Sequence, residues 1–337
     1  VAELRRRSVV QSRGRWRAVL PHAIANRLAA QALERIPQAQ LDALCVTMSP
    51  RMRKSFTRRL GYLHDSQEAK QAVVRWLRPS GLFGDLLAGG AQSVQLLRNI
   101  APVAPEAVLQ HIEKELAGPN GLAILSTNSS SRMQLATLLK SIAYEARLFD
   151  HSVSLLVKFL SEEKHGETRN SVKGIFEEIF HIHLSGTDAL PAQRRRFILD
   201  LYSRHDSDCI RCANLALRAL LRTGHFSSAS NFEFGARPRD YGWNPPTYGD
   251  IWSWYSDGVS LALQVATDTK LRPEMRRIIS ASLRGILPFE AGLRAIEAAA
   301  AEFLKDSEWI EGWAAVRQAI RFDGEKWRPE IKASVLA

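Results

Sequence analysis

Apolar residues recur at helical spacing along most of this chain. Within residues 104–116 they stand at Val108, Leu109, Ile112 and Leu116, with Pro105 suited to the first turn. Spacings of three and four residues place side chains on one face of a helix. The same pattern predicts further helices over 21–35, 130–144, 148–160, 168–184, 190–204, 207–222, 248–267, 272–286, 289–304 and 309–321.

The connections between these segments are short and are marked by Gly, Pro, Asn or Asp, which favour turns. Two antiparallel helices with their turns recur over roughly 40 residues, which is the spacing of HEAT and armadillo repeats. Residues 206–223 are typical of the second helix of such a repeat, with Asp206 or Ser207 as the N-cap. The pattern therefore predicts an all-α fold, an α-solenoid of antiparallel helix pairs. An irregular helical domain is the alternative, because no window of this length closely matches another.

Residues 223–257 interrupt the helical pattern with one long aromatic-rich insertion. Nine of the 27 aromatic residues fall between Phe226 and Tyr255, among Gly, Pro, Asn and charged residues. A β-hairpin is expected, if anywhere, only within 226–245. Long loops are often functional or packed as a unit of their own. The insertion is either self-packed, covering one end of the array, or a recognition loop whose ligand contacts would be Asn231, Glu233, Arg237, Asp240, Tyr241 and Trp243.

The positive charge of the chain is concentrated at one end. Residues 1–60 carry thirteen basic and three acidic side chains, a net charge of +10 out of +11 for the whole chain. Twelve of the thirteen are arginines, which favour planar, bidentate contacts. A basic end on a nearly neutral body indicates one contact surface rather than a general affinity for nucleic acid.

Two clusters within this basic segment are candidates for partner binding. Arginines around an aromatic ring grip phosphates and stack on a base, or face an acidic protein surface. In the second cluster, three basic residues at spacings of three and four positions share one helical face. This face either contacts a phosphate backbone or is simply solvated. The candidate contact residues are Arg13, Arg15, Trp16 and Arg17 in the first cluster, and Arg51, Lys54 and Arg58 in the second.

The sequence carries no motif of a common catalytic site. It has no GxxxxGK[ST] phosphate loop, GxSxG, HExxH or GxGxxG, so we assign no catalytic residue, no metal ligand and no cofactor. Cys209 and Cys212 form a CxxC without a second ligand pair, which favours core packing. His181 and His183 are read as one core and one exposed residue. The pair of glutamates at 177–178 is read as solvated helix surface.

Composition points to a soluble, cytoplasmic protein. Three cysteines are too few for a disulfide scaffold, and their odd number favours a reducing compartment. The chain has no run of apolar residues long enough for a transmembrane helix, so we expect no membrane partner. No apolar segment follows the basic N-terminus, as a secretory signal would require. Because the chain opens at Val1 without Met, we read it as a piece of a longer protein.

Several strings resemble a known protein family. RRRSVVQSRGRWRAVLPHAIANRLAAQAL looks like the region that follows the P-loop module in large bacterial STAND-type NTPases. The strings that are similar to the helical array of such proteins are LRNIAPVAPEAVL, SIAYEARLFDHSVSLLVKF, IFHIHLSGTDALPAQRRRFI and FEFGARPRDYGWNPPTYGDIWSWY. The resemblance covers most of the chain and implies a nucleotide switch upstream of it, with the array as sensor or scaffold. Such proteins are often linked to anti-phage defence or signalling.

These observations favour a non-catalytic helical-repeat sensor or scaffold that binds a protein or nucleic-acid ligand. We expect a basic helical segment at 1–60 joining an upstream NTPase module, repeats at 61–225, the insertion at 226–247 and C-terminal repeats at 248–337. One alternative is a HEAT-like nucleic-acid-binding protein that uses the basic N-terminal face. Another is an enzyme with an unrecognised site near the insertion, built from Asp240, Glu233 and His225.

Overall fold

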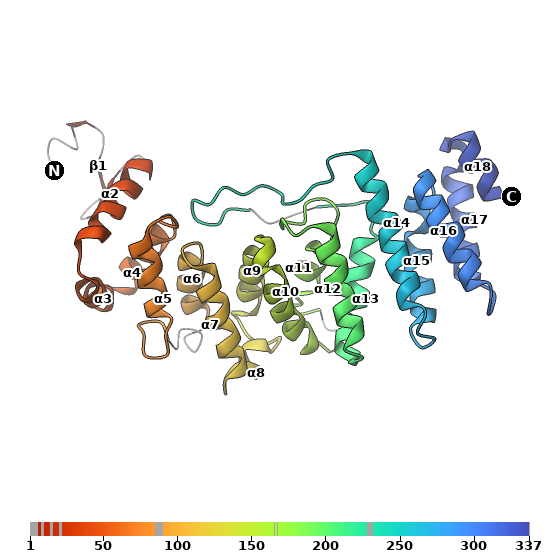
Figure 1. The fold of residues 1–337 in the computed structure, drawn as a ribbon. Helices are drawn as coiled ribbons and strands as arrows, with labels where there is room; N and C mark the ends of the chain where they lie inside the picture. Colours follow the sequence, from red (N-terminus) through yellow and green to blue (C-terminus); the bar gives the residue numbers. More distant parts are fainter. Residues whose placement is uncertain are drawn as a thin grey trace. The chain divides into compact units, whose positions relative to one another are not determined.

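A computed structural model describes residues 6–7, 10–13, 16–19, 22–84, 90–164, 166, 168–227 and 232–336. These residues are mainly helical, as predicted (Figure 1). The chain divides into two compact units. The first comprises Val1–Leu138 and Glu233–Arg239, and the second comprises Leu139–Phe232 and Asp240–Ala337. The sequence predicts four segments, at 1–60, 61–225, 226–247 and 248–337, and their bounds were drawn from composition. This division stays a prediction.

The first unit begins with a β-hairpin, where the sequence predicted only helix. Strand β1 (Val10–Arg13) pairs antiparallel with β2 (Trp16–Val19), and Arg13 lies opposite Trp16. Valine and tryptophan favour extended backbone, and this preference forms the strands despite the surrounding arginines. The expectation that a hairpin would occur only within 226–245 was therefore wrong. Gly14 and Arg15, which separate the strands in the sequence, lie outside the described residues.

The helices of the first unit start where the sequence supplies caps. Ser49 and Ser66 accept hydrogen bonds from the backbone at Met52 and Ala69, and Pro105 occupies a first turn as predicted. These helices are α2 (His22–Arg35), α3 (Gln38–Thr47), α4 (Pro50–Leu60), α5 (Gln67–Trp76), α6 (Ala91–Ile100), α7 (Pro105–Ala117), α8 (Gly121–Leu125) and α9 (Arg132–Ile142), whose last residues belong to the second unit.

The helices of the second unit pack in a regular order. They are α10 (Ala146–Ser161), α11 (Lys173–Glu178), α12 (Pro191–Ser203), α13 (Ser207–Leu220), α14 (Tyr248–Val265), α15 (Arg272–Ile286), α16 (Glu290–Phe303), α17 (Ile310–Asp323) and α18 (Pro329–Leu336), with a 3₁₀ turn at Gly324–Lys326. Helix α14 contacts both α12 and α16, and α15 contacts both α13 and α17 (Figure 1). Along α12–α17, alternate helices therefore stack against one another.

A fully buried arginine holds the centre of the second unit together. Arg194, on α12, donates to three backbone carbonyls: Nε to Ala189 at 2.9 Å, and the terminal nitrogens to His181 at 2.8 Å and Thr187 at 3.2 Å. Burial lowers the pKa of Arg194 to about 9, against the opposing charge of Asp188, so the side chain stays charged at neutral pH. The turn before α12 is thereby fixed to the helix that follows it.

Two indole rings complete the environment of this guanidinium. The ring centroids of Trp243 and Trp254 lie 5.8 Å and 5.4 Å from the Arg194 Cζ, within cation–π range. The two rings stack on each other with centroids 5.5 Å apart and planes inclined by 17°. Trp254 Nε1 also donates to the carbonyl of Leu220 at 2.7 Å. The C-terminal part of the insertion is therefore packed onto α12 and α14 through Trp243.

Across the part of the chain that the structure describes, no helix is both long and apolar enough to cross a lipid bilayer.

Replacing Arg194 tests this central role. We expect Arg194→Met to lower the free energy of unfolding by about 3 kcal/mol, because the buried carbonyls of His181 and Ala189 lose their donor, while that of Thr187 keeps the amide of Trp243. Arg196→Met is the matched control on the same helix. Arg196 is exposed and ion-paired with Asp150, so its loss should cost less than about 1 kcal/mol. Urea denaturation followed by circular dichroism measures both values, and similar costs for the two variants would contradict the assignment.

Candidate functional site

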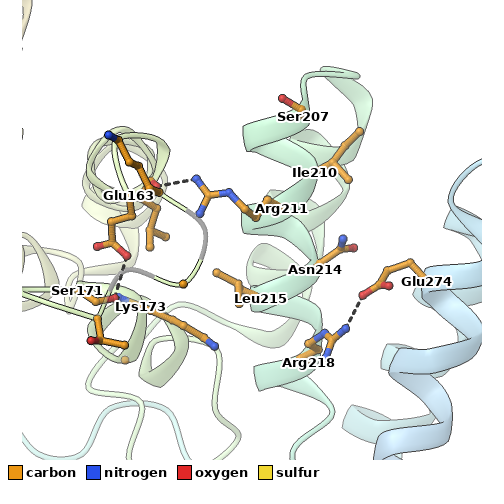
Figure 2. Close-up of a pocket in the computed structure, with 15 residues that line it drawn as sticks. Glu163, Ser171, Lys173, Ser207, Ile210, Arg211, Asn214, Leu215, Arg218 and Glu274 are labelled. Atoms are coloured by element: carbon orange, nitrogen blue, oxygen red, sulfur yellow. Dashed lines mark hydrogen bonds and ion pairs between the residues drawn. The ribbon is translucent and has the colours of Figure 1, made fainter. Parts of the chain in front are cut away.

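A groove of about 900 Å³ runs along the outer face of α13 in the second unit (Figure 2). The opposite side of the groove comes from the end of α10, the segment that leads into α11, and the start of α15. The α13 residues that line it follow helical spacing and occupy one face: Ser207, Ile210, Arg211, Asn214, Leu215 and Arg218.

The sequence of α13 explains this orientation. Its other face is buried and carries small and apolar residues, among them Cys212, Ala216 and Leu220, which allow close helix packing. Asp206 caps the helix by accepting a hydrogen bond from the backbone of Cys209 at 2.9 Å, one of the two predicted caps. An amphipathic helix with a fixed start therefore presents its polar face to the groove.

Charged side chains in the groove are held in defined positions. Arg211 donates to the carbonyl of Leu160 at 2.6 Å, and Arg218 forms an ion pair with Glu274. Glu163 accepts hydrogen bonds from the Ser171 hydroxyl at 2.8 Å and from a neighbouring backbone amide. The lining carries two more cations than carboxylates, since it also includes two lysines: Lys164 and Lys173. Arg211 and Lys173 are also ion-paired with Asp208 and Glu177, which lie outside the lining, so the excess of positive charge around the groove is small.

Asn214 offers the groove an oriented amide. Burial raises the pKa of Tyr202, so its hydroxyl stays protonated and donates to Asn214 Oδ1 at 2.7 Å. Since the carboxamide oxygen faces Tyr202, the NH₂ group is left to donate to a ligand. An oriented NH₂ group beside the apolar side chains of Ile210 and Leu215 suits a peptide backbone carbonyl and its neighbouring side chain.

Part of the insertion packs within the first unit. In Glu233–Arg239, Phe234 is buried, and the Arg239 Cζ lies 3.9 Å from the centroid of its ring. Gly235 has a φ of +62°, and a Cβ atom there would lie 2.2 Å from the carbonyl oxygen of Gly61. Only glycine tolerates both the positive φ and the close approach of the Gly61 carbonyl oxygen.

The predicted ligand-contact residues of the insertion are divided between the two units. Asn231 lies outside the described residues. Glu233 is exposed in the first unit, whereas Arg237 there donates from Nε to the carbonyl of Pro102 at 2.7 Å. Arg237 therefore anchors the insertion.

The remaining predicted contacts belong to the second unit. Asp240 accepts hydrogen bonds from the Tyr144 hydroxyl at 3.0 Å and the Gly242 amide at 2.8 Å, which orders the turn. Trp243 is stacked beside Arg194, as described above. Tyr241 is 59% exposed, with the ring of Phe232 edge-on against it. Tyr241 is thus the most accessible aromatic of this group.

The second predicted basic cluster has the expected geometry. Arg51, Lys54 and Arg58 are all exposed on α4. Two other arginines of this helix serve the fold, because Arg53 donates to backbone carbonyls of α3 and Arg59 donates to an asparagine of α2. In the first predicted cluster, Arg15 lies outside the described residues, and the structure describes only the backbones of Arg13, Trp16 and Arg17.

The sequence-based prediction of the setting of two acidic residues was wrong. Glu177 and Glu178 were expected on solvated surface, but both are partly buried. Burial raises the pKa of Glu177, and Glu178 is ion-paired with Lys140. The sequence of the short helix α11 does not indicate that these glutamates are partly buried, because α9 and α13 bury them.

The cysteines and histidines mostly follow expectation. Cys212 is buried and Cys209 half-buried, and both are free thiols. His181 is buried, whereas His183 is half-buried and lies 2.7 Å from Asn244 Oδ1. Among the described residues, no three His, Cys, Asp or Glu side chains gather as a set that would hold a metal ion.

No protein-family model matches the chain, and no curated protein or solved structure gives a significant match. The resemblance to STAND-type NTPases therefore stays a prediction from the sequence.

The pKa of His181 sets a pH dependence for the second unit. Burial, assisted by the charges of Arg222, Lys140 and Arg194, lowers the pKa of His181 from 6.5 to about 4. The unfolded chain therefore takes up this proton at higher pH than the folded chain. The contribution of the neutral His181 side chain to the free energy of unfolding is fully present above pH 6.5, and it is lost as the pH falls towards 4. Between about pH 7 and about pH 5, this group should lower the free energy of unfolding by about 2 kcal/mol.

The measurement is urea denaturation at both pH values for the wild type, His181→Phe and the exposed control His225→Phe. We expect His181→Phe to show the smallest loss of stability on acidification, and His225→Phe to behave as the wild type. An unchanged loss in His181→Phe would contradict the assignment.

Proposed function

We propose that this chain is a non-catalytic helical-repeat region that binds a protein ligand. The observation that carries the proposal is the packing of α12–α17, in which each inner helix contacts the helices two positions before and after it. Such packing is typical of an α-solenoid of the HEAT or armadillo type, whose stacked repeats create extended binding surfaces.

The groove along α13 is the proposed ligand site, and its occupant is an acidic, extended peptide segment of a partner protein. The four cations of the lining, against two carboxylates, support an acidic ligand, which would compete with Asp208 and Glu177 for Arg211 and Lys173. The NH₂ group of Asn214 would bind a backbone carbonyl, and Ile210 and Leu215 would contact an apolar side chain. These features suit recognition of peptide rather than covalent chemistry.

On the resemblance alone, we extend the proposal to the wider protein. The chain would be the sensor or scaffold region of a cytoplasmic STAND-type NTPase, acting in signalling or anti-phage defence. A ligand that prefers one arrangement of array and NTPase module would shift that equilibrium by its differential affinity.

Nucleic acid is the second candidate ligand, because Arg51, Lys54 and Arg58 form an exposed basic face on α4. If this face contacts phosphates, affinity for duplex DNA should fall steeply with salt. The triple replacement by Gln should then flatten that dependence.

Selection of peptides from a phage-displayed random library against the full chain tests the proposed function. We expect acidic sequences to be enriched. Leu215→Asp, which puts a carboxylate into the groove, should weaken the selected peptides at least about tenfold, a difference of about 1.4 kcal/mol. Leu304→Asp, the same change at an exposed leucine outside the groove, should alter affinity less than about twofold.

Equal losses in the two variants would place the peptide elsewhere and contradict the proposal. Salt-dependent DNA binding that the α4 replacements abolish, without enrichment of any peptide, would favour the second candidate instead.

A further inference from the structure

The outer face of α17 carries large apolar side chains that are exposed. Ile310, Trp313 and Phe322 are 66%, 61% and 56% exposed, and the helix that follows, α18, leaves them uncovered. A helix at the end of a stacked row normally presents a polar outer face to water. Three large apolar residues on one such face therefore indicate a surface that a partner covers.

The packing of the neighbouring helices indicates which kind of element fits this face. Helix α17 contacts α15, and α15 in turn contacts α13, so the three form one row (Figure 1). On the side opposite its outer face, α17 buries Gly312 and Ala319, which allow close helix packing. The next position in this row lies over the outer face of α17, and another α-helix would continue the packing there.

An arginine near the end of each helix in this row points to the charge of that partner. Arg218, Arg284 and Arg321 each stand two residues before the last residue of α13, α15 and α17. The first two form ion pairs with the next helix of the row, Arg218 with Glu274 and Arg284 with Asp323. Arg321 is exposed, and among the described residues it meets the ring of Phe322 but no carboxylate. The third arginine of the series therefore lacks its acidic partner.

A second arginine on the same face is also without a carboxylate. Arg317 stands one turn before Arg321, and its Cζ lies 4.6 Å from the ring centroid of Trp313, within cation–π range. Like Arg321, it forms no ion pair within the described part of the chain. Tryptophan and arginine are the residues most enriched among those that dominate binding energy in protein interfaces. The face thus combines apolar contacts with two arginines open to carboxylates.

We propose that the outer face of α17 docks an amphipathic α-helix of a partner protein. The apolar stripe of that helix covers Ile310 and Trp313, and its carboxylates pair with Arg317 and Arg321. A second copy of α17 would bring the same two arginines against themselves, so charge favours a different protein. A nucleic-acid strand would pair with the arginines but would leave the aliphatic side chain of Ile310 unmatched. The inference goes beyond the proposed function, since no residue of α17 lines the groove along α13.

Selection of helices by phage display against the full chain tests the proposal. The probe is a stable three-helix scaffold in which the residues on one face of one helix are randomised, so that only folded helices are presented. We expect the enriched faces to combine apolar residues with Asp or Glu.

Charge reversal tests the expected ion pair. Arg321→Glu should weaken the selected scaffold at least about tenfold, and a change of the facing scaffold carboxylate to Lys should restore binding to this variant. The matched control is Arg294→Glu, at an exposed arginine on α16 that is ion-paired with Glu290, and it should leave affinity within about twofold.

The apolar contact has its own pair of variants. Ile310→Ser should weaken the scaffold at least about tenfold, because the partner helix then covers a hydroxyl in place of an aliphatic side chain. Leu190→Ser, at a similarly exposed leucine just before α12, should leave affinity within about twofold. Circular dichroism checks that each variant keeps its helices.

Absence of any enriched helix would overturn the proposal, and so would scaffolds whose binding Arg321→Glu and Ile310→Ser leave unchanged. Sedimentation of the full chain and titration with oligothymidine test the other occupants. Dimers that Ile310→Ser abolishes would assign the face to a second copy, and DNA binding that Arg321→Glu abolishes would assign it to nucleic acid. Either result would overturn the proposal. The peptide selection for the groove does not involve α17, so the two proposals fail separately.

Discussion

The guanidinium of Arg194 is the interaction on which the second unit depends. Burying a cation is costly unless every donor finds an acceptor, and here backbone carbonyls and two indole faces meet that requirement. The groups that surround it come from the turn before α12, the insertion and α14. Segments separated by some tens of residues must therefore adopt one arrangement together.

This constraint also positions the candidate site. One carbonyl that Arg194 holds belongs to His181, so this residue is fixed through its backbone. Trp254, packed against Arg194, donates to the last residue of α13 and fixes the end of the helix that lines the groove. The groove presents mixed polar and apolar contacts.

Helical periodicity predicted most helices with nearly correct bounds, but it overestimated one helix and did not predict several others. The segment 272–286 matches α15 in full, and 104–116 matches α7 within one residue at each end, because both carry an apolar stripe and a proline in the first turn. The expected helix at 168–184 is confined to Lys173–Glu178. Helices α3, α5, α6, α8 and α18 were not predicted, and neither was the hairpin at 10–19, whose short strands alternate with arginines.

The candidate sites were less predictable, for a physical reason. The basic face of α4 follows from spacing within one helix, and the structure keeps it exposed. The groove instead joins side chains from α10, α11, α13 and α15, and only tertiary packing brings these together. The insertion attracted notice through its aromatic residues, but Trp243 serves packing and Arg237 anchors the backbone.

The central claim is that the groove along α13 holds the peptide ligand, and photo-crosslinking tests it most directly. A photo-reactive amino acid replaces Ile210 in the groove, Tyr241 in the insertion or Lys54 on α4, and each protein is irradiated with a selected acidic peptide. We predict strong crosslinking from position 210 and little from positions 241 and 54. Crosslinking mainly from position 241 or 54 would contradict it.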